Sequence, residues 1–328
     1  MNLKQKADSV IEVPVVTSFT SLGYDLRRRL FDWASTSSYD LTGNMIVLTG
    51  ATSGLGKAAA MQLANCGASL VLVGRTAERN EAAVADVAHA TGNTSISQVP
   101  ADMGDLEQVR QLARAVLEQN DRIDVLIHNA GALSATRQLA PDGTEATVAS
   151  QVVGPFLLTA LLLDRLAESR PSRVLTMSSG GMYAANLTVS QLQMPLESYK
   201  GTEQYARAKR AQVTLNELLA QRFGDRGVHF QALHPGWADT PGVDESLPIF
   251  SKVLGPVLRS PQEGADTLVW LAADDAATES NGLFWHDRRA RSIHKLPTTK
   301  RSDTPERRRR LWDWVAETAE LPDGWDDA

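Results

Sequence analysis

The stretch from Asn44 to Lys57 constrains the fold of this chain more than any other. It joins a continuous apolar run to three glycines and a helix-forming sequence, and such a run without alternation is typical of a parallel strand buried on both faces. Gly50 suits a tight turn, Gly54 lets a ligand approach the backbone, and Gly56 lets the helix pack against the strand. The free amides at the helix start then predict an anion site, most simply for a pyrophosphate. A plain strand-to-helix turn is the alternative for this stretch taken alone.

Buried strands and helices alternate regularly after this stretch. The pattern predicts one Rossmann-type α/β domain, a doubly wound and mostly parallel sheet of about seven strands with helices on both faces. Right-handed crossovers place the ligand crevice at the carboxyl ends of the strands, so we expect the chemistry just after each strand. The predicted strands are 44–49, 69–74, 95–100, 123–128, 173–178, 229–234 and 282–285, and the predicted helices are 55–66, 78–90, 106–119, 144–168, 203–223 and 261–273.

Composition argues against several classes of function. The net charge of −6 and the lack of a basic stripe argue against nucleic-acid binding. Cys66 is the single cysteine, so no disulfide forms within the chain, and we interpret it as a small buried residue of the first helix after the glycine turn. The six histidines show no spacing that brings two onto one helix face, which predicts no metal site. We find neither an apolar run of membrane-spanning length nor the order of a signal peptide, so we expect a cytoplasmic location.

Two segments flank the domain, which we delimit at 44–292. In the N-terminal extension, 1–43, apolar residues recur at helical spacing around Arg27–Arg29, which predicts a short basic amphipathic helix. We expect its apolar stripe to pack on the domain and its arginines to be solvated, with contact to a membrane surface as the alternative. The stripe consists of Leu22, Leu26, Leu30, Phe31 and Trp33.

The C-terminal tail, 293–328, is predicted to be helical. Thr304-Pro305-Glu306 is a good helix start, and an apolar stripe follows the run Arg307–Arg310. We interpret the arginine run as a solvated face rather than a binding patch. The stripe consists of Leu311, Trp312, Val315 and Ala319.

The end of the second predicted strand distinguishes between two dinucleotides. A site for NAD places a carboxylate here, roughly 20 residues past the glycine turn, to accept hydrogen bonds from the ribose 2′-hydroxyl. None is present, and Arg75 stands there instead. Because an arginine pairs with a 2′-phosphate through a bidentate fork, the sequence favours NADP over NAD. An exposed surface arginine is the alternative.

Polar and small residues follow the third and fourth strands. Asp102, next to Met103, is placed to meet an adenine amino group. Asn129, Ala130 and Gly131 are small residues where a flat ring must lie close to the backbone, and Asn129 is also expected to bridge neighbouring strand ends. Each of these alone says little, because Asp and Asn favour loops in any protein.

A serine, a tyrosine and a lysine suggest proton transfer. Ser178 and Ser179 follow the fifth strand, while Tyr205 and Lys209 lie four residues apart on the next helix and so share a face. Hydride transfer to a carbonyl creates an alkoxide that needs a proton, which a phenol gives only if its pKa falls from about 10 towards the operating pH. A neighbouring ammonium lowers that pKa, and a serine hydroxyl holds the substrate oxygen beside the phenol. The spacing alone also arises by chance.

The sixth strand ends in a sharp turn at Pro235-Gly236. The turn is expected to bring the Thr240 hydroxyl back to a carboxamide. Residues 241–260 then form an excursion, punctuated by Pro and Gly, that is too long for a simple connector. We predict that this excursion is a lid over the cleft.

Taken in order, these segments resemble the short-chain dehydrogenase/reductase family over about residues 44–290. The resemblance rests on Thr49–Gly56, Asn129–Gly131, Ser179, Tyr205-x-x-x-Lys209 and Pro235-Gly236. Four further segments resemble, within the family, the subgroup called dehydrogenase/reductase member 12: Ser178–Met182, His234–Val243, Gly264–Thr267 and Phe284-x-x-Asp287-Arg288.

The resemblance implies an NAD(P)-dependent oxidoreductase that interconverts a carbonyl and an alcohol on a mostly apolar small molecule. It implies that Tyr205 is the general acid/base, that Lys209 lowers its pKa and binds the nicotinamide ribose, and that Ser179 rather than Ser178 orients the carbonyl. Together with the positions above, it gives the cofactor-binding set Gly50, Thr52, Ser53, Gly54, Leu55, Gly56, Arg75, Asp102, Met103, Asn129, Ala130, Gly131, Tyr205, Lys209, Pro235, Gly236 and Thr240.

One position departs from the family pattern. The family usually has an asparagine on the helix after the fourth strand, which holds a water in the proton relay behind the lysine. Gln151 stands in its place, with the same donors and acceptors on a chain one methylene longer. We expect the relay to be shifted but to survive. The alternative is a catalytically weak or inactive NADP(H)-binding sensor or scaffold. Family analogy suggests a homodimer or homotetramer through the two long helices.

Overall fold

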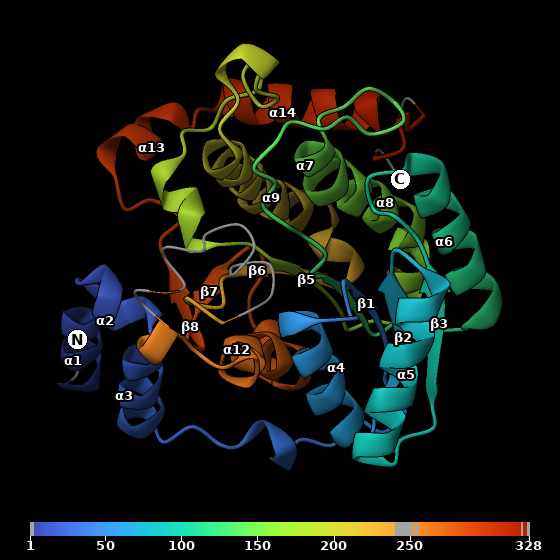
Figure 1. The fold of residues 1–328 in the computed structure, drawn as a ribbon, viewed down its shortest axis with the longest axis vertical. Coiled ribbons are helices and arrows are strands. Elements are labelled where there is room, and N and C mark those ends of the chain that lie inside the picture. The colour runs from blue at the N-terminus through green and yellow to red at the C-terminus, as the bar shows by residue number, and fades with distance from the viewer. Residues whose placement is uncertain (1–2, 240–251, 253–254, 323, 327–328) are drawn as a thin grey trace.

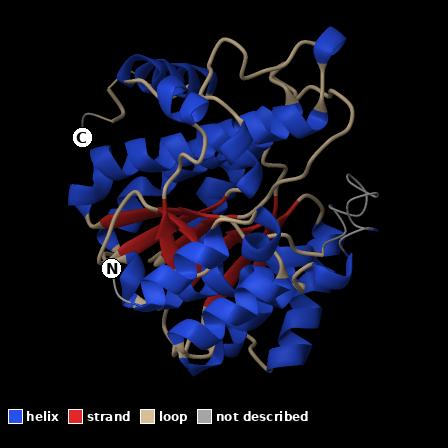
Figure 2. Cartoon of the chain, turned by 90° about the vertical axis from the view of Figure 1, so that its left-hand side faces the viewer, coloured by secondary structure: helices blue, strands red, loops and turns tan. Residues whose placement is uncertain are grey.

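The computed structural model describes residues 3–239, 252, 255–322 and 324–326. Within these ranges the chain forms one twisted sheet with helices on both sides (Figures 1 and 2). Thr240 and most of the predicted lid at 241–260 lie outside the described residues.

The sheet has eight strands in the order β3-β2-β1-β4-β5-β6-β7-β8. All neighbours are parallel except β7 and β8, which form an antiparallel hairpin. The predicted α/β sheet is therefore confirmed, with one strand more than expected. The bounds are β1 Met45–Thr49, β2 Ser69–Gly74, β3 Ile96–Pro100, β4 Val125–His128, β5 Ser172–Met177, β6 Val228–Leu233, β7 Phe284–His286 and β8 Arg289–Arg291.

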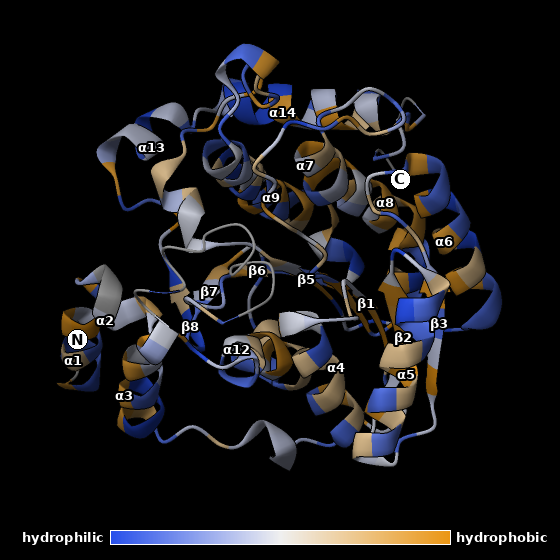
Figure 3. Cartoon of the chain, viewed as in Figure 1, coloured by the Kyte–Doolittle hydropathy of each residue, from blue (hydrophilic) through white to orange (hydrophobic). Residues whose placement is uncertain are grey.

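The helices form a layer on each face of the sheet. One layer contains α4 (Gly54–Asn65), α5 (Ala77–Thr91) and α12 (Pro261–Ala273), and the other contains α6 (Leu106–Gln119), α8 (Gly154–Glu168) and α9 (Gly201–Phe223). Each layer has its own apolar core against the sheet. Figure 3 shows that the strands are largely hydrophobic, and α6 buries Val109, Leu112 and Val116 on its inner side.

The predicted helix 144–168 is interrupted near its start. A short helix α7 (Ala146–Val148) passes through a π-helical turn (Ala149–Val153) into α8. The combined run 146–168 is long and apolar enough to span a membrane, so the expectation that no such run exists is wrong. Since 78% of its most apolar window is buried inside the domain, the run has the surroundings of a core helix.

The N-terminal segment packs beside β7 and β8 at one edge of the sheet (Figure 1). It contains α1 (Leu3–Glu12), α2 (Val15–Phe19) and α3 (Ser21–Phe31). The predicted amphipathic helix is present as α3, and the stripe residues Leu30, Phe31 and Trp33 are half-buried, but the expectation is wrong at three other positions. Arg27 is fully buried, whereas Leu22 and Leu26 are 53% and 40% exposed. Only Arg28 and Arg29 are exposed, as predicted.

The C-terminal tail forms α13 (Pro297–Ser302) and α14 (Pro305–Thr318). The predicted start of α14 is confirmed, because the Thr304 side chain accepts from the Arg307 amide. Its predicted apolar stripe is buried, and Trp312 packs edge-on against Phe156 of α8 at 5.1 Å. The arginine run is not wholly solvated, since Arg308 pairs with Asp303 at 2.6 Å and with Glu217 of α9 at 2.5 Å. The tail thus covers the outer side of α8 and α9.

Candidate active site

The glycine turn lies at the carboxyl end of β1, where α4 begins. Gly50 has a φ of +69°, and a Cβ at this residue would lie 2.7 Å from the Ala130 Cα. A Cβ on Gly56 would lie 2.0 Å from the Gly50 carbonyl oxygen. Both contacts are closer than any side chain allows, so the turn, the helix start and the loop after β4 meet backbone to backbone. The first amides of α4 therefore open above the sheet, with Thr52, Ser53 and Leu55 in the same turn.

Asn129 joins the ends of β1 and β4, as the sequence predicted. Its side-chain amide donates to the carbonyls of Thr49 and Gly50, both at 3.1 Å, and its backbone amide donates to the Thr49 hydroxyl at 3.1 Å. The order of strands reverses between β1 and β4, and ligands of open α/β sheets bind in the crevice at such a point. Ala130 and Gly131 continue from Asn129 along this crevice.

Three candidate residues follow the outer strands. Arg75 lies exposed after β2 and makes no hydrogen bond or ion pair within the described parts of the chain. Asp102 follows β3, and its carboxylate accepts from the Gly104 amide at 2.8 Å, so it also shapes its own loop. Met103 is buried beside it. These residues lie at the carboxyl edge of the sheet, on the β2–β3 side of the glycine turn.

Ser179, Tyr205 and Lys209 converge next to the crevice. Ser179 follows β5; its hydroxyl accepts from the Gly181 amide at 3.2 Å and lies close enough to Tyr205 on α9 to favour a lower pKa of the phenol. The Lys209 ammonium lies 5.3 Å from the centre of the Tyr205 ring and donates to the Met177 carbonyl at 2.9 Å. The neighbouring Ser178 is buried, and its hydroxyl donates to the Lys209 carbonyl at 3.1 Å. Ser178 therefore braces the helix against the strand, while Ser179 faces the phenol.

Burial dominates the electrostatics of this group. It raises the pKa of Tyr205 to about 12, against the opposing effect of the Ser179 hydrogen bond. Burial likewise lowers the pKa of Lys209 to about 7. The expected depression of the tyrosine pKa by the lysine charge is thus absent from the protein alone, where burial raises the pKa of the phenol.

Gln151 lies on the π-helical turn and is 1% exposed. Its side-chain amide donates to the Ala132 carbonyl at 2.7 Å, and its backbone carbonyl accepts from the side-chain amide of Gln212 at 2.6 Å. Its Oε1 is buried without a hydrogen-bond partner in the described chain. A Cβ placed on Gly131 would lie 3.0 Å from this Oε1 and 3.3 Å from the Lys209 Nζ, so both atoms face the same point.

A small internal cavity of about 30 Å³ lies behind this group, between α8, α9 and the sheet. His128 and Gln212 line it, and each has a buried polar atom without a partner among the described residues. Burial lowers the pKa of His128 to about 3, so this imidazole is neutral. Sequence reasoning missed Gln212, although its position one helical turn after Lys209 was a usable signal.

The turn after β6 completes the site. Gly236 has a φ of +76°, in agreement with the predicted sharp turn at Pro235-Gly236. Two residues that sequence reasoning missed contact this turn, namely Phe19 from the N-terminal segment and Arg259, which precedes α12. No group of three or more His, Cys, Asp or Glu side chains in the described ranges has the arrangement of a metal site.

Known proteins match most of the length of this chain. The sequence model of the family described as short chain dehydrogenase matches residues 44–248. Human dehydrogenase/reductase SDR family member 12 is 37% identical over 281 residues, which cover 85% of this chain and 87% of that protein. Human retinol dehydrogenase 13 is 32% identical over 297 residues, which cover 88% of this chain and 87% of that protein.

Solved structures share the fold. One is a protein of Beutenbergia cavernae that is provisionally assigned as an NAD(P) dependent gluconate 5-dehydrogenase and has NADP bound at low occupancy. It is 25% identical with a TM-score of 0.62, over 76% of this chain and 96% of its own.

Proposed function

Since the chain belongs to the short-chain dehydrogenase/reductase family, we propose that it interconverts a carbonyl and an alcohol with NADP(H) as the hydride carrier. The observation that carries the proposal is the convergence of Ser179, Tyr205 and Lys209 beside the glycine turn. Binding of a nucleotide alone does not require the phenol of Tyr205 and the hydroxyl of Ser179 to lie together at the strand ends.

The residues present fit a dinucleotide. Gly50 and Gly56 pack tightly against backbone, the first amides of α4 suit a pyrophosphate, and the exposed Arg75 suits a 2′-phosphate. Asp102 and Met103 would border the adenine, and Asn129–Gly131 with Pro235-Gly236 would border the nicotinamide half. The NADP bound in the Beutenbergia cavernae protein supports this choice of cofactor. When bound, the nicotinamide supplies or accepts the hydride.

The chain's own residues then handle the oxygen and the proton. Ser179 would hold the carbonyl oxygen, and Tyr205 would transfer its phenolic proton to that oxygen as the hydride reaches the carbonyl carbon. Lys209 would bind the nicotinamide ribose and stabilise the phenolate that remains. The Oε1 of Gln151 is an acceptor that faces Lys209, and it would hold the water through which the replacement proton reaches the amine, in place of the family's asparagine.

A mostly apolar small molecule is the proposed substrate. Human retinol dehydrogenase 13 is named for an apolar alcohol, which supports this class. The cytoplasmic location and the assembly into a homodimer or homotetramer stay predictions. The C-terminal tail lies over part of α9, one of the two long helices proposed to form the interface.

A panel of aldehydes, ketones and quinones with NADPH tests the function directly. We expect at least one member to be reduced, with the loss of NADPH absorbance as the readout, and we expect Tyr205→Phe to lower kcat by 100-fold or more, roughly the contribution of general acid catalysis. Tight NADPH binding without oxidation by any member would favour the alternative of a cofactor-binding sensor.

Replacing Ser178 and Ser179 one at a time distinguishes a role in catalysis from a role in packing. Ser179→Ala should lower kcat/KM by about 100-fold with little change in melting temperature, because this hydroxyl faces the substrate oxygen. Ser178→Ala should keep most activity but lose about 1 kcal/mol of unfolding free energy, because its buried bond to the Lys209 carbonyl is lost. The assignment is wrong if Ser178→Ala is the variant that loses turnover.

The two directions of reaction should differ in pH dependence. Tyr205, with its pKa raised to about 12, keeps its proton at neutral pH, so carbonyl reduction needs no titration of the phenol. Lys209, with its pKa lowered to about 7, is charged only below that pH, so kcat/KM for reduction should fall as pH rises above 7. Alcohol oxidation needs the phenolate and should accelerate towards alkaline pH. Lys209→Arg, whose charge does not titrate, should flatten the reduction profile; an unchanged midpoint in this variant would exclude Lys209 as its origin.

Arg75 should decide between the two dinucleotides. Arg75→Ala removes the proposed fork to the 2′-phosphate, so the Kd for NADPH should rise by about 10- to 100-fold, while the Kd for NADH stays within about twofold. Arg114→Ala, an exposed arginine of α6, is the matched control and should change neither value. Equal effects of Arg75→Ala on both cofactors would contradict the assignment.

A further inference from the structure

The turn 235–239 after β6 is held from outside the sheet by two residues. The Trp237 amide donates to the Phe19 carbonyl at 2.7 Å, and the Arg259 amide donates to the Trp237 carbonyl at 2.8 Å. The guanidinium of Arg259 also donates to the Pro235 carbonyl at 3.1 Å. A Cβ on Gly236 would lie 2.7 Å from the Phe19 carbonyl oxygen, so the N-terminal segment lies directly against this turn.

The ring of Phe19 connects the two loops that border the proposed nicotinamide site. A Cβ on Gly180, the residue after Ser179, would lie 2.7 Å from the Phe19 ring. The same ring makes edge contacts with His234 at 4.6 Å and with Trp237 at 5.7 Å. One side chain from the N-terminal segment therefore contacts the loop after β5 and the loop after β6.

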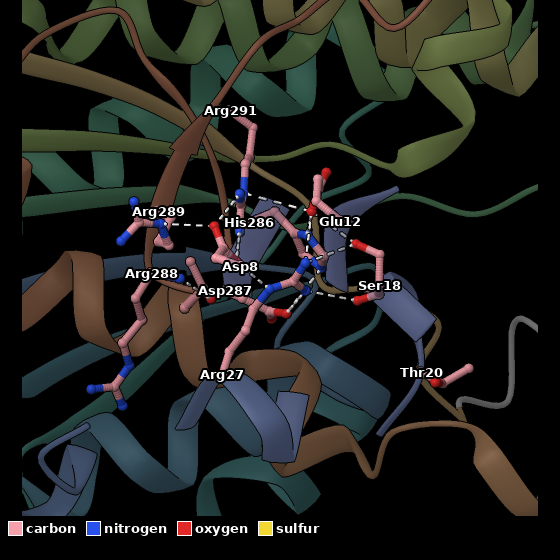
Figure 4. A network of polar contacts seen from close by, with 12 residues as sticks. Asp8, Glu12, Ser18, Thr20, Arg27, His286, Asp287, Arg288, Arg289 and Arg291 are labelled. Carbon is pink, nitrogen blue, oxygen red and sulfur yellow. Dashed lines mark hydrogen bonds and ion pairs between the residues drawn. The ribbon is translucent and has the colours of Figure 1, made fainter. Parts of the chain in front are cut away.

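A buried charge network anchors the segment in this position. Arg27 and Arg259 are 0% and 1% exposed, and both donate to the carboxylate of Asp287 at 2.6 Å. Arg27 also binds Asp8 at 2.9 Å and Glu12 at 2.7 Å from α1. Figure 4 shows these acidic side chains and Arg27 pointing towards the end of β7.

Arg259 links this network back to the segment itself. Its guanidinium donates to the carbonyls of Ser18 at 3.0 Å and Thr20 at 3.2 Å, on either side of Phe19. It thus contacts the N-terminal segment, the turn 235–239 and Asp287 at once. A guanidinium offers five donors in a rigid plane, whereas an ammonium offers three on a flexible stem.

The hairpin between β7 and β8 is built to present Asp287. Asp287 and Arg288 both have a φ of +53°, a region that residues with side chains rarely adopt and that two-residue hairpins usually fill with Asn-Gly. The contacts of the two side chains explain why Asp and Arg, rather than Asn and Gly, occupy these positions. Asp287 receives Arg27 and Arg259, and Arg288 pairs with Asp266 of α12 at 2.6 Å. The segment Phe284-x-x-Asp287-Arg288 singled out in the sequence is this hairpin.

We propose that the N-terminal segment 3–31 is a positioning element of the nicotinamide end of the site, acting through Phe19, Arg27 and Arg259 on the turn 235–239 and on Gly180. This inference rests on the proposed function. The adenosine half of the cofactor would be untouched, because Arg75 and Asp102 follow β2 and β3, at the opposite end of the strand order from β7 and β8.

Binding of whole and half cofactors tests the proposal. The Kd values of NADPH and of 2′,5′-ADP, which lacks the nicotinamide half, are measured for the full chain and three variants. Arg259→Lys, which loses charge-assisted hydrogen bonds, and Phe19→Leu, which loses the ring contacts to the two loops, should each weaken NADPH binding by about tenfold. The Kd of 2′,5′-ADP should stay within about twofold. The matched control is Arg173→Lys at the amino end of β5, a buried arginine that donates to the Asp274 carbonyl. It should leave the ratio of the two Kd values unchanged.

The proposal is overturned if both cofactor forms weaken in proportion, or if neither changes, in Phe19→Leu. That variant decides alone should Arg259→Lys not fold. If the unmodified chain binds neither NADPH nor 2′,5′-ADP, the proposed function fails instead, and hydrogen exchange decides the positioning role. Faster exchange of a peptide covering 234–239 in Phe19→Leu than in Arg173→Lys supports it, and equal exchange overturns it.

Discussion

The contact between the Gly50 carbonyl and the Cα of Gly56 is the constraint on which the rest of the site depends. A methyl group at position 56 would have to lie 2.0 Å from that carbonyl oxygen, so α4 can begin here only without a side chain. The close approach fixes the angle at which α4 leaves β1, and Asn129 then holds β4 against the same turn with two bonds of 3.1 Å. Because backbone rather than side chains fills this junction, its amides stay open to an anion. The positions of Ser179 and Tyr205 have meaning only relative to this junction.

The buried charge network of Arg27, Arg259 and Asp287, near the nicotinamide end of the site, costs free energy to form. Stability alone therefore does not explain why the network is present. Removing each ion from water costs several kcal/mol, and a buried pair returns this only with excellent geometry. Asp287 has that geometry, with two guanidinium groups at 2.6 Å, and these charges hold the pKa of its carboxyl far below the usual range. The left-handed backbone of Asp287 and Arg288 adds strain on the order of 1–3 kcal/mol per residue. An apolar contact would hold a helix against the domain at a lower free-energy cost. What the network adds is directional hydrogen bonding, which apolar contacts lack. It fixes where Phe19 and Arg259 lie against the turn 235–239.

The sequence predicted what local patterns encode and missed what distant contacts decide. Helices 106–119 and 261–273 match to the residue, and seven strands fall within a few residues of their predicted bounds, because buried parallel strands are continuous apolar runs. The eighth strand, Arg289–Arg291, has no apolar pattern and exists only through its pairing with β7. Arg27 was assigned to solvent because a run of three arginines, Arg27–Arg29, resembles an exposed face, and its partners Asp8 and Asp287 lie 19 and 260 residues away. The π-helical turn at Gln151 was also missed; its backbone carbonyl accepts from Gln212, 61 residues further on, a contact that no local pattern shows.

In the protein alone, the pKa values of Tyr205 and Lys209 favour a neutral phenol beside the lysine over a pair of phenolate and ammonium. Burial raises the pKa of the phenol to about 12 and lowers that of the ammonium to about 7, so near neutral pH the phenol is protonated and the amine is half titrated. Giving a proton to substrate would leave a phenolate, and its negative charge would raise the pKa of Lys209 and draw a proton onto the amine. In the proposed mechanism the unpartnered Oε1 of Gln151, which faces the same point as the Lys209 Nζ, would hold a water between the amine and solvent.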